Sequence, residues 1–543
     1  MAVSQEIIHA DRSFPHGNPL VSCRLFSNAV VMEASIPPAT RLPNTLRRQT
    51  HTAMQPYKLL FPYRLQRRAN LSVRNGFSGL FLCCVLFLLA GTVHAQDAFP
   101  LDFTVIRLGE GPRTVLVVGG IQGDEPGGFS AATLLSTHYQ MKNGSVWVVP
   151  NLNFPSIIKR SRGLHGDMNR KFARLDDKDP EFATVRRIQE LIDHPQVALV
   201  LNLHDGSGYY RHKYEDKLRN PARWGQSVII DQTDLPGVFM GALEAEADKA
   251  AATANEALIQ AGHRLHVHNT KTADGDHEME RSLSFYAVRK GKAAFGLEAS
   301  KEFSVELRAY YHLLMVESFL RQAGVDFSRS FALTPEGVRG ALQDNLAVSF
   351  ADNRVFLPLE DARPAINYLP LPKGGPAQAV PTKPIMAVLP CAKGSEGQFC
   401  VHYGNRMLTL IRPEWREVDN SLSGVHARVD GEDRQIPFGQ VVYVGDSLLV
   451  EPIEGYRVNA IGFDNGKPDE AGVDLRLKDF MPRFSVDKQG KMFRVEVYRN
   501  QLFSGMFLVY FDKDKQNSPN RPRMARNAGS LPDRPGPESS LGF

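Results

Sequence analysis

The sequence has little cysteine, and its longest apolar run is shorter than a typical membrane-spanning helix. Only five of the 543 residues are cysteine, and three of these lie before residue 95. The longest apolar run, from Leu80 to Ala90, has eleven residues, whereas a membrane-spanning helix needs about 20. A fold held together by many disulfides is therefore excluded. A retained anchor, in which residues 77–93 would span a thin bilayer, is the less favoured interpretation.

The chain also lacks an excess of charge outside its N-terminal part. Its formal net charge is +5, but residues 1–95 contain ten Lys or Arg against three acids. The remaining residues contain 54 basic and 56 acidic side chains, which is a net charge of −2. The basic character therefore gives no support for binding nucleic acid. With 43% hydrophobic and 23% charged residues, the chain has an ordinary globular composition.

Residues 1–95 have the features of an export leader. Arginines at positions 64, 67, 68 and 74 precede the apolar run, and small residues follow it up to Ala95. This order is typical of a secretory signal peptide, so we expect cleavage near Ala95 and a periplasmic or secreted protein. Residues 1–53 show no sustained periodicity, and we expect Met54 to be the true start.

Two cysteines remain after the leader, Cys391 and Cys400, and they bound a ten-residue segment. A pair of cysteines in an exported protein is most simply a disulfide. A structural zinc site is the weaker alternative, because it would need four ligands and His402 is the one further candidate nearby.

Short apolar runs alternate with helical patterns between about residues 103 and 324. Strands are predicted at 114–120, 146–149, 197–204 and 293–298, and helices at 126–138, 180–194, 237–262 and 304–323. Apolar strands that alternate with helices are typical of an α/β fold. We therefore predict a first domain over residues 96–327, with a mostly parallel or mixed sheet and flanking helices.

The pattern changes after about residue 328 to short apolar or alternating runs between clusters of Gly, Pro, Asn and Asp. Such runs are typical of small all-β modules. We predict two of them, over residues 328–412 and 413–513. The last segment, 514–543, is polar and contains five prolines, so we predict that it is disordered.

Polar side chains follow three of the predicted strands where those strands end. Gln122 and Glu125 lie in the segment GGIQGDEPGG after the first strand, His204 ends a second strand, and Glu298 ends a third. A polar stretch at 160–170, RSRGLHGDMNR, lies between the first two. Open α/β sheets place their sites at the carboxyl ends of strands, so we expect these four clusters to converge on one cleft.

These segments resemble motifs of the zinc carboxypeptidases of the M14 type. GGIQGDEPGG is similar to their G-x-H-G-x-E-P-x-G turn, DMNRKF to their D-L-N-R-x-F carboxylate clamp, NLHDG to the strand with their last histidine ligand, and FGLE to the strand with their general base. One departure is Gln122, where the family has His. In this the chain resembles an exported branch, the peptidoglycan D,L-carboxypeptidases that determine helical cell shape, which use Gln, Glu and His on zinc and carry β-rich modules.

The resemblance assigns the metal chemistry to four residues. Gln122, Glu125 and His204 would hold Zn²⁺ and leave a fourth position for water. Glu298 would take a proton from that water and return it to the leaving amine. Taken alone, Gln122 would suggest an inactive site, because an amide oxygen is a weaker ligand than imidazole; the exported branch makes it a family feature instead.

The resemblance also assigns the contacts with substrate. Asn169 and Arg170 would bind the terminal carboxylate of the substrate. Arg162 would stabilise the developing oxyanion, with Arg160 as the alternative for that role. Two further candidates for the wall of the pocket are Trp224 and Ser284.

Several of these residues also have a purely structural interpretation. Glu125 would be favoured by the dipole in the first turn of a helix, His204 is compatible with a core position, and the pair Asn169-Arg170 with a surface turn. Trp224 is more often a packing residue than a recognition residue. Glu298 is harder to explain in this way, because an acid that ends an apolar strand needs a partner or a purpose.

Three histidines elsewhere, His263, His266 and His268, suggest either a second metal site or one face of a strand. Leu265 and Val267 alternate with them, and this period of two favours an exposed strand face.

We therefore predict an exported zinc D,L-carboxypeptidase that trims peptidoglycan stem peptides and contributes to cell shape. By resemblance it would release meso-diaminopimelate from a muramyl tripeptide and leave a dipeptide. One competing function is an amidoacylase of the desuccinylase or aspartoacylase kind, which is typically cytoplasmic and lacks an export signal. Another is a non-catalytic scaffold that binds the cell wall. The expected partners are peptidoglycan muropeptides and, through the β modules, other cell-wall proteins; a membrane is expected only if the leader is retained.

Overall fold

The computed structural model describes residues 101–274, 277–391 and 396–512. The predicted signal peptide, the expected start at Met54 and the predicted disordered tail at 514–543 lie outside these residues. None of the helices within the described ranges combines the length and the hydropathy that crossing a bilayer requires.

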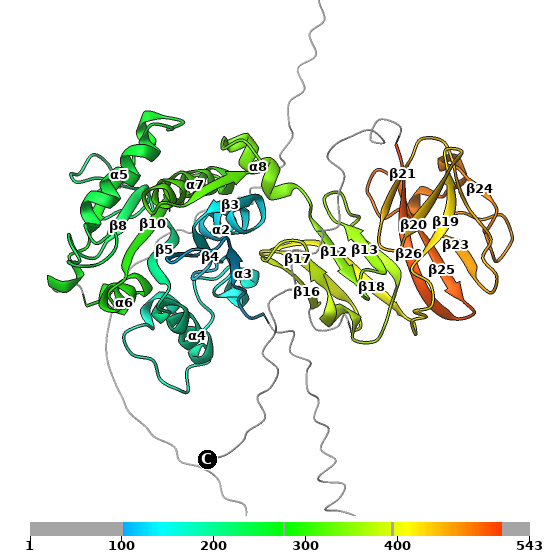
Figure 1. Cartoon of the computed structure of the whole chain (residues 1–543), viewed down its shortest axis with the longest axis horizontal. Helices are drawn as coiled ribbons and strands as arrows, with labels where there is room; N and C mark the ends of the chain where they lie inside the picture. The colour runs from blue at the N-terminus through cyan, green and yellow to red at the C-terminus, as the bar shows by residue number, and fades with distance from the viewer. Residues whose placement is uncertain (1–100, 275–276, 392–395, 513–543) are drawn as a thin grey trace, which may run out of the picture. The chain divides into compact units, whose positions relative to one another are not determined.

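A seven-stranded mixed sheet forms the centre of the first domain (Figure 1). Its strand order is β1 (Ile106–Leu108), β4 (Ser145–Val149), β2 (Thr114–Val118), β5 (Val197–Gly206), β10 (Ala293–Ser300), β8 (Ser227–Ile230) and β9 (His266–Asn269). The strands β4, β2, β5 and β10 are parallel, whereas β1 and β8 run antiparallel to β4 and β10. The predicted α/β fold with a parallel or mixed sheet is confirmed.

Successive residues of the central strands face two different hydrophobic cores. In β2, Val115 and Val117 belong to one core, and Leu116 and Val118 to the other, because side chains alternate along a strand. The helices that cover the first side are α2 (Pro126–His138), α5 (Leu243–Asn255) and α7 (Val305–Gln322); those on the second are α4 (Phe182–Asp193) and α6 (Leu283–Arg289). Burial on both faces explains the continuous apolar sequence of these strands.

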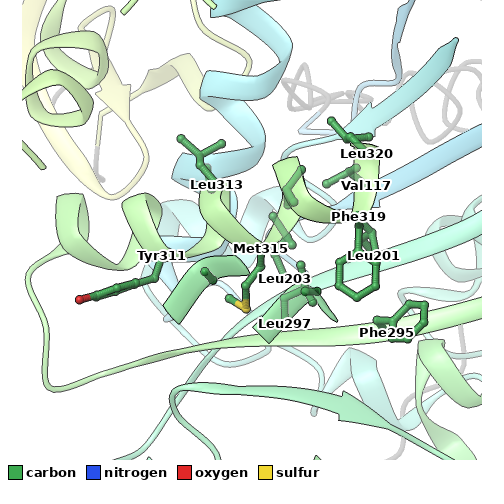
Figure 2. Packing of buried hydrophobic residues seen from close by; sticks show 14 of the residues in the cluster. Val117, Leu201, Leu203, Phe295, Leu297, Tyr311, Leu313, Met315, Phe319 and Leu320 are labelled. Atoms are coloured by element: carbon green, nitrogen blue, oxygen red, sulfur yellow. The ribbon is translucent and has the colours of Figure 1, made fainter. Parts of the chain in front are cut away.

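Figure 2 shows the first of these cores, where α7 packs on the sheet. Phe295 of β10 and Phe319 of α7 lie with their ring centroids 4.4 Å apart, and both are fully buried. Burying a side chain of this size stabilises a fold by roughly 1.5 to 3 kcal/mol. This packing fixes α7 against the two strands, β5 and β10, that carry His204 and Glu298 near their carboxyl ends.

The predicted helix at 126–138 coincides with α2, whereas the helix predicted at 237–262 is wrong at both ends. Gly237 adopts a φ of 75°, which is outside the helical region. At the other end, the side chain of Asn255 pairs with the backbone N–H and C=O of Leu265. These bonds end α5 and turn the chain toward β9.

His266 and His268 lie on β9, as their alternation predicted, but their rings are half-buried and do not form an exposed face. His268 stacks on Tyr210 with a centroid separation of 4.0 Å, and His266 meets His212 edge to face at 5.3 Å. Burial lowers the pKa of both rings to about 4. In the part of the chain that the structure describes, no three His, Cys, Asp or Glu side chains form a group able to hold a metal ion.

Two further cores, both built from β-strands, follow the first domain. One core lies among strands that form a sheet in the order β13 (Val355–Pro358), β12 (Ala347–Phe350), β15 (Val380–Pro381) and a sheet in the order β14 (Ala365–Leu371), β18 (Arg406–Trp415), β17 (Phe399–Tyr403), β16 (Met386–Pro390). The other lies among β20 (Glu432–Pro437), β19 (Gly424–Val429), β22 (Leu448–Val450), β24 (Asp474–Leu475) and among β21 (Val441–Val444), β26 (Leu502–Phe511), β25 (Met492–Arg499), β23 (Arg457–Ala460). The prediction of all-β modules after the α/β domain is confirmed.

The boundaries between these parts are less sharp than the cores. The first core extends past residue 327 into α8 (Pro335–Gln343), and β18 runs through residue 412. The domain limits therefore stay a prediction.

Cys391 and Cys400 are paired beside β16 and β17, with Cα atoms 5.2 Å apart, a separation that a disulfide spans.

The short helix α3 (Phe154–Lys159) connects the first domain with the β-strand core that follows it. Phe154 and Ile157 pack with Phe129 of α2 against Ile385 and Ala387. Beneath the loop that follows β2, Gly123 lies so close to α3 that a Cβ atom there would meet the carbonyl carbon of Ser156 at 2.0 Å. The glycine-rich loop that carries Gln122 and Glu125 is therefore supported by helix α3.

Candidate active site

A cleft of about 320 Å³ lies at the carboxyl ends of β2, β5 and β10. Its lining includes Gln122 and Glu125 after β2, His204 in β5, and Glu298 in β10. These are the residues that the sequence places at strand ends, and the parallel arrangement of the three strands brings them together.

Three atoms able to bind a metal ion converge at the floor of this cleft. His204 Nδ1 lies 3.0 Å from Glu125 Oε2 and 3.2 Å from Gln122 Oε1. All three residues are buried. Gln122 Nε2 donates a hydrogen bond of 2.8 Å to Asp167 Oδ1, and this bond turns the amide oxygen toward His204.

The charges around His204 explain its protonation behaviour. Burial disfavours the charged imidazole, but the hydrogen bond from His204 to Glu125 and the negative charges of Glu125 and Glu298 outweigh burial and raise its pKa. Without a cation, the surrounding carboxylates thus favour the protonated form of His204.

The donor set fits a divalent transition metal. It offers one imidazole nitrogen, one carboxylate oxygen and one amide oxygen, and the first two are usual zinc donors. A site built only from His, Cys, Asp and Glu does not form here because the third donor is the neutral amide of Gln122. A cation at the point where the three atoms meet would take over the role of the proton between His204 and Glu125.

Glu298 lies directly beside His204 because β10 and β5 pair in parallel with these two residues in register. Its side chain is buried, and its Oε2 atom has no hydrogen-bond partner among the described residues. Burial raises the pKa of Glu298 and His204 lowers it; with the raising effects of the Glu125 and Asp205 charges, the pKa is about 8. A buried carboxyl group without a donor is costly, which favours a functional role over a structural one.

The residues expected to contact substrate differ in their position relative to the cleft. Asn169, Arg170 and Arg162 line the cleft. Asn169 Oδ1 accepts a hydrogen bond from the backbone N–H of Leu283, and Arg170 Nε lies 3.2 Å from Glu278 Oε2. Arg162 is half exposed, with Nη1 at 3.5 Å from Glu125 Oε1 and Nη2 at 2.9 Å from Asp167 Oδ2.

The remaining candidates separate into two groups. Trp224 and Ser284 both line the cleft, and the ring of Trp224 lies 5.1 Å from that of His268. Arg160, in contrast, is exposed at the C-terminal end of α3, where its φ of 48° directs the chain out of the helix, and it does not line the cleft. Of the two arginines proposed to stabilise the oxyanion, Arg162 is the one that lines the cleft.

Several residues at this site escaped the sequence patterns. Lys301 lines the cleft, with Nζ at 3.2 Å from Glu125 Oε1. Asp167 holds both Gln122 and Arg162. Asp205 follows His204 directly and is 1% exposed. Their positions next to recognised residues, in DMNRKF, NLHDG and just after FGLE, were the available signal.

Two family models match the chain. The one described as the catalytic part of carboxypeptidases controlling helical cell shape matches residues 80–343. The one described as the C-terminal domain of metallo-carboxypeptidases matches residues 418–512. A comparison with curated protein sequences gives no significant match.

Solved structures of the cell shape determinant protein Csd4 from Helicobacter pylori are similar to this chain. The apo form is 40% identical, with a TM-score of 0.69, and the alignment covers 76% of this chain and 100% of that chain. A tripeptide-bound form is 39% identical with the same coverage and TM-score. A form bound to mDAP, described as a D,L-carboxypeptidase, is 40% identical with a TM-score of 0.69, covering 75% of this chain and 100% of that chain.

The resemblance that the motifs suggested thus extends over the catalytic domain, the C-terminal domain and the fold as a whole. The chain belongs to the family of carboxypeptidases that control helical cell shape, and it is a peptidase.

Proposed function

We propose that this protein is a zinc D,L-carboxypeptidase of the cell wall, which releases terminal meso-diaminopimelate from a peptidoglycan tripeptide and leaves a dipeptide. The observation that carries the proposal is the convergence of Gln122, Glu125 and His204 with Glu298 in register beside them. The similar Csd4 structures were solved with a tripeptide and with mDAP bound, which supports the same class of substrate here.

Gln122 Oε1, Glu125 Oε2 and His204 Nδ1 would hold the metal ion. When bound, Zn²⁺ supplies a Lewis acid that polarises the scissile carbonyl and acidifies a water molecule. The bond from Gln122 to Asp167 and the bond from the Asp205 N–H to Glu125 keep two of these donors aimed at one point.

Glu298 would carry the proton. Its carboxyl group lies in the cleft, is shielded from bulk water and has no competing donor on Oε2 among the described residues. In its ionised form, which the positive charge of a bound zinc ion would favour, it can accept a proton from the attacking water and deliver it to the leaving amine of the diaminopimelate.

The substrate would be held by polar groups that line the same cleft. Arg170 and Asn169 would bind the terminal carboxylate, which an arginine can hold through two parallel hydrogen bonds. Arg162 is half exposed and is paired with Asp167 and Glu125, and it would stabilise the oxyanion that develops during attack.

Mass spectrometry of muropeptides tests the proposed reaction. Purified, zinc-loaded protein should convert muramyl tripeptide to dipeptide with release of diaminopimelate, and a chelator should abolish the conversion. Persistence of the tripeptide with loaded protein would refute the proposal and favour a cell-wall-binding scaffold. Cleavage of acylated amino acids in its place would indicate the amidoacylase.

Replacing Arg170 by methionine should weaken substrate binding more than chemistry. A hydrogen bond to a charged group contributes about 1.5 to 3 kcal/mol, so we expect KM for the tripeptide to rise by about 10- to 100-fold, while kcat changes less. Arg170→Lys should fall between the two, because lysine keeps the charge but loses the bidentate geometry. Steady-state kinetics measures both constants. As a control, Arg186→Met on the exposed face of α4 should change neither; a fall in kcat alone for Arg170→Met would contradict the assignment.

Export with cleavage of the leader predicts the N-terminus and the thiol content of the mature chain. Cleavage near Ala95 leaves Cys391 and Cys400 as the two remaining cysteines, and their pairing leaves no free thiol. N-terminal sequencing of protein from the periplasm or medium should therefore begin at or near Gln96, and thiol titration after denaturation should find none. Recovery of the protein in the membrane fraction with residues 77–93 intact would show an uncleaved anchor.

A further inference from the structure

Asp205 lies immediately after His204 and is completely enclosed, with a side-chain exposure of 0%. The proposed chemistry uses its backbone N–H but gives its side chain no role, because the carboxylate bonds to α2 and α7. Three groups from two elements, α2 and α7, bond to this one carboxylate, and both elements are connected to residues of the candidate active site.

The first donor is the beginning of α2. Asp205 Oδ2 accepts a hydrogen bond of 2.8 Å from the backbone N–H of Gly127, the second residue of the helix. Gly127 has no side chain in the way: a Cβ atom there would lie 2.4 Å from Asp205 Oδ1. The carboxylate of Asp205 therefore satisfies an N–H group that the helix itself leaves unpaired.

This contact changes what Glu125 does. Glu125 is the N-cap residue of α2, and its side chain makes no capping bond. In most helices a short polar side chain at the N-cap, such as Asp or Asn, accepts a bond from the N–H of the second or third helical residue. Here Asp205 occupies that donor, and the Glu125 carboxylate turns to His204 Nδ1 and to the backbone N–H of Asp205.

The second and third donors come from α7. Arg308 Nη1 lies 3.1 Å from Asp205 Oδ2, and His312 Nε2 lies 3.2 Å from Asp205 Oδ1. Arg308 also donates to the backbone oxygens of Lys301 and Phe303, in the loop that directly follows the strand of Glu298. One carboxylate thus links the segments that carry Glu125, His204 and Glu298.

We infer that Asp205 is a positioning residue for the metal site: it caps α2 in place of Glu125 and thereby sets Glu125 and His204 at the separation that the metal ion requires. The inference rests on the proposed function, since it assumes that these two side chains bind zinc. Groups that hold metal ligands in place typically contribute about 10- to 100-fold to metal affinity.

Zinc affinity, measured by competition with a chromophoric chelator, tests this role in the full-length mature protein. Asp205→Asn retains one oxygen for Gly127 and Arg308 and can donate to His312, so we expect the dissociation constant for zinc to rise by roughly 10-fold. Asp205→Ala frees Gly127 N–H for Glu125, and we expect a rise of about 100-fold. The rise in Tm when zinc is added should shrink in the same order.

A matched control separates positioning from stability. Asp231 is another fully buried aspartate, held by Thr272 at the end of β8, and Asp231→Asn should lower Tm without changing zinc affinity. If both Asp205 variants lose stability but bind zinc as the wild-type protein does, the carboxylate is merely structural and the inference is wrong. If Asp205→Ala does not fold, Asp205→Asn decides. A wild-type protein that binds no zinc would refute the proposed function as well.

Discussion

Replacing Glu298 by glutamine is expected to lower kcat for tripeptide cleavage by about 10² to 10⁴, the usual contribution of a group that transfers a proton. Glutamine has the same shape but cannot take up a proton at neutral pH. The carboxyl group it replaces is buried and has one oxygen without a donor in the described structure, so removing its charge should not weaken the fold. We therefore expect the zinc content and Tm to stay at the wild-type level while turnover falls.

Glu317 offers a control for this substitution. It is as deeply buried, but it is held by Tyr139, Arg321 and Arg329 and lies on α7 away from the cleft. Glu317→Gln should lower Tm, because it weakens these ion pairs, and leave kcat unchanged. Turnover by Glu298→Gln comparable with that of the wild-type protein would exclude Glu298 as the proton carrier.

Removing His204 is expected to abolish both zinc binding and activity. In His204→Ala, Glu125 and Gln122 remain as one carboxylate and one amide oxygen, and the imidazole nitrogen that zinc favours is lost. Elemental analysis of the purified protein should fall from about one zinc per chain, the stoichiometry of a single three-ligand site, to background. Tripeptide cleavage should fall with it.

Gln122→Ala provides the comparison within the same site. An amide oxygen is a neutral and weaker donor than imidazole, so this variant should bind zinc more weakly than the wild-type protein but retain some occupancy at high zinc concentration. The expected order of zinc affinity is wild-type, then Gln122→Ala, then His204→Ala. Equal zinc content in all three proteins would show that the metal is held elsewhere.

Much of this site could be predicted because its residues stand at the ends of parallel strands. Gln122, Glu125, His204 and Glu298 each follow an apolar run, and the sheet necessarily brings such positions to one edge. The α/β fold itself follows from the alternation of apolar strands and helices. The order of the motifs along the chain indicated the family.

Other parts could not be predicted because they depend on contacts between distant segments. Arg160 and Arg162 are two positions apart, and only the folded chain shows that Arg162 lines the cleft while Arg160 ends α3 with a positive φ. The network of Asp205 joins residues 78 to 107 positions apart, and no periodicity marks such a pair. The extent of α5 was overestimated because the bonds that end it come from Leu265.

The register of β5 and β10 has a consequence for how preparations of this enzyme behave. His204 and Glu298 face each other across neighbouring strands, and main-chain hydrogen bonds hold such strands roughly 4.8 Å apart. The spacing of the two residues is therefore set by the pairing of the strands and does not depend on the length of the loops. A slip of one residue would direct the Glu298 side chain to the opposite face of the sheet, so a misaligned molecule would be inert and not merely slow. The specific activity of a sample would then be proportional to its fraction of correctly folded molecules.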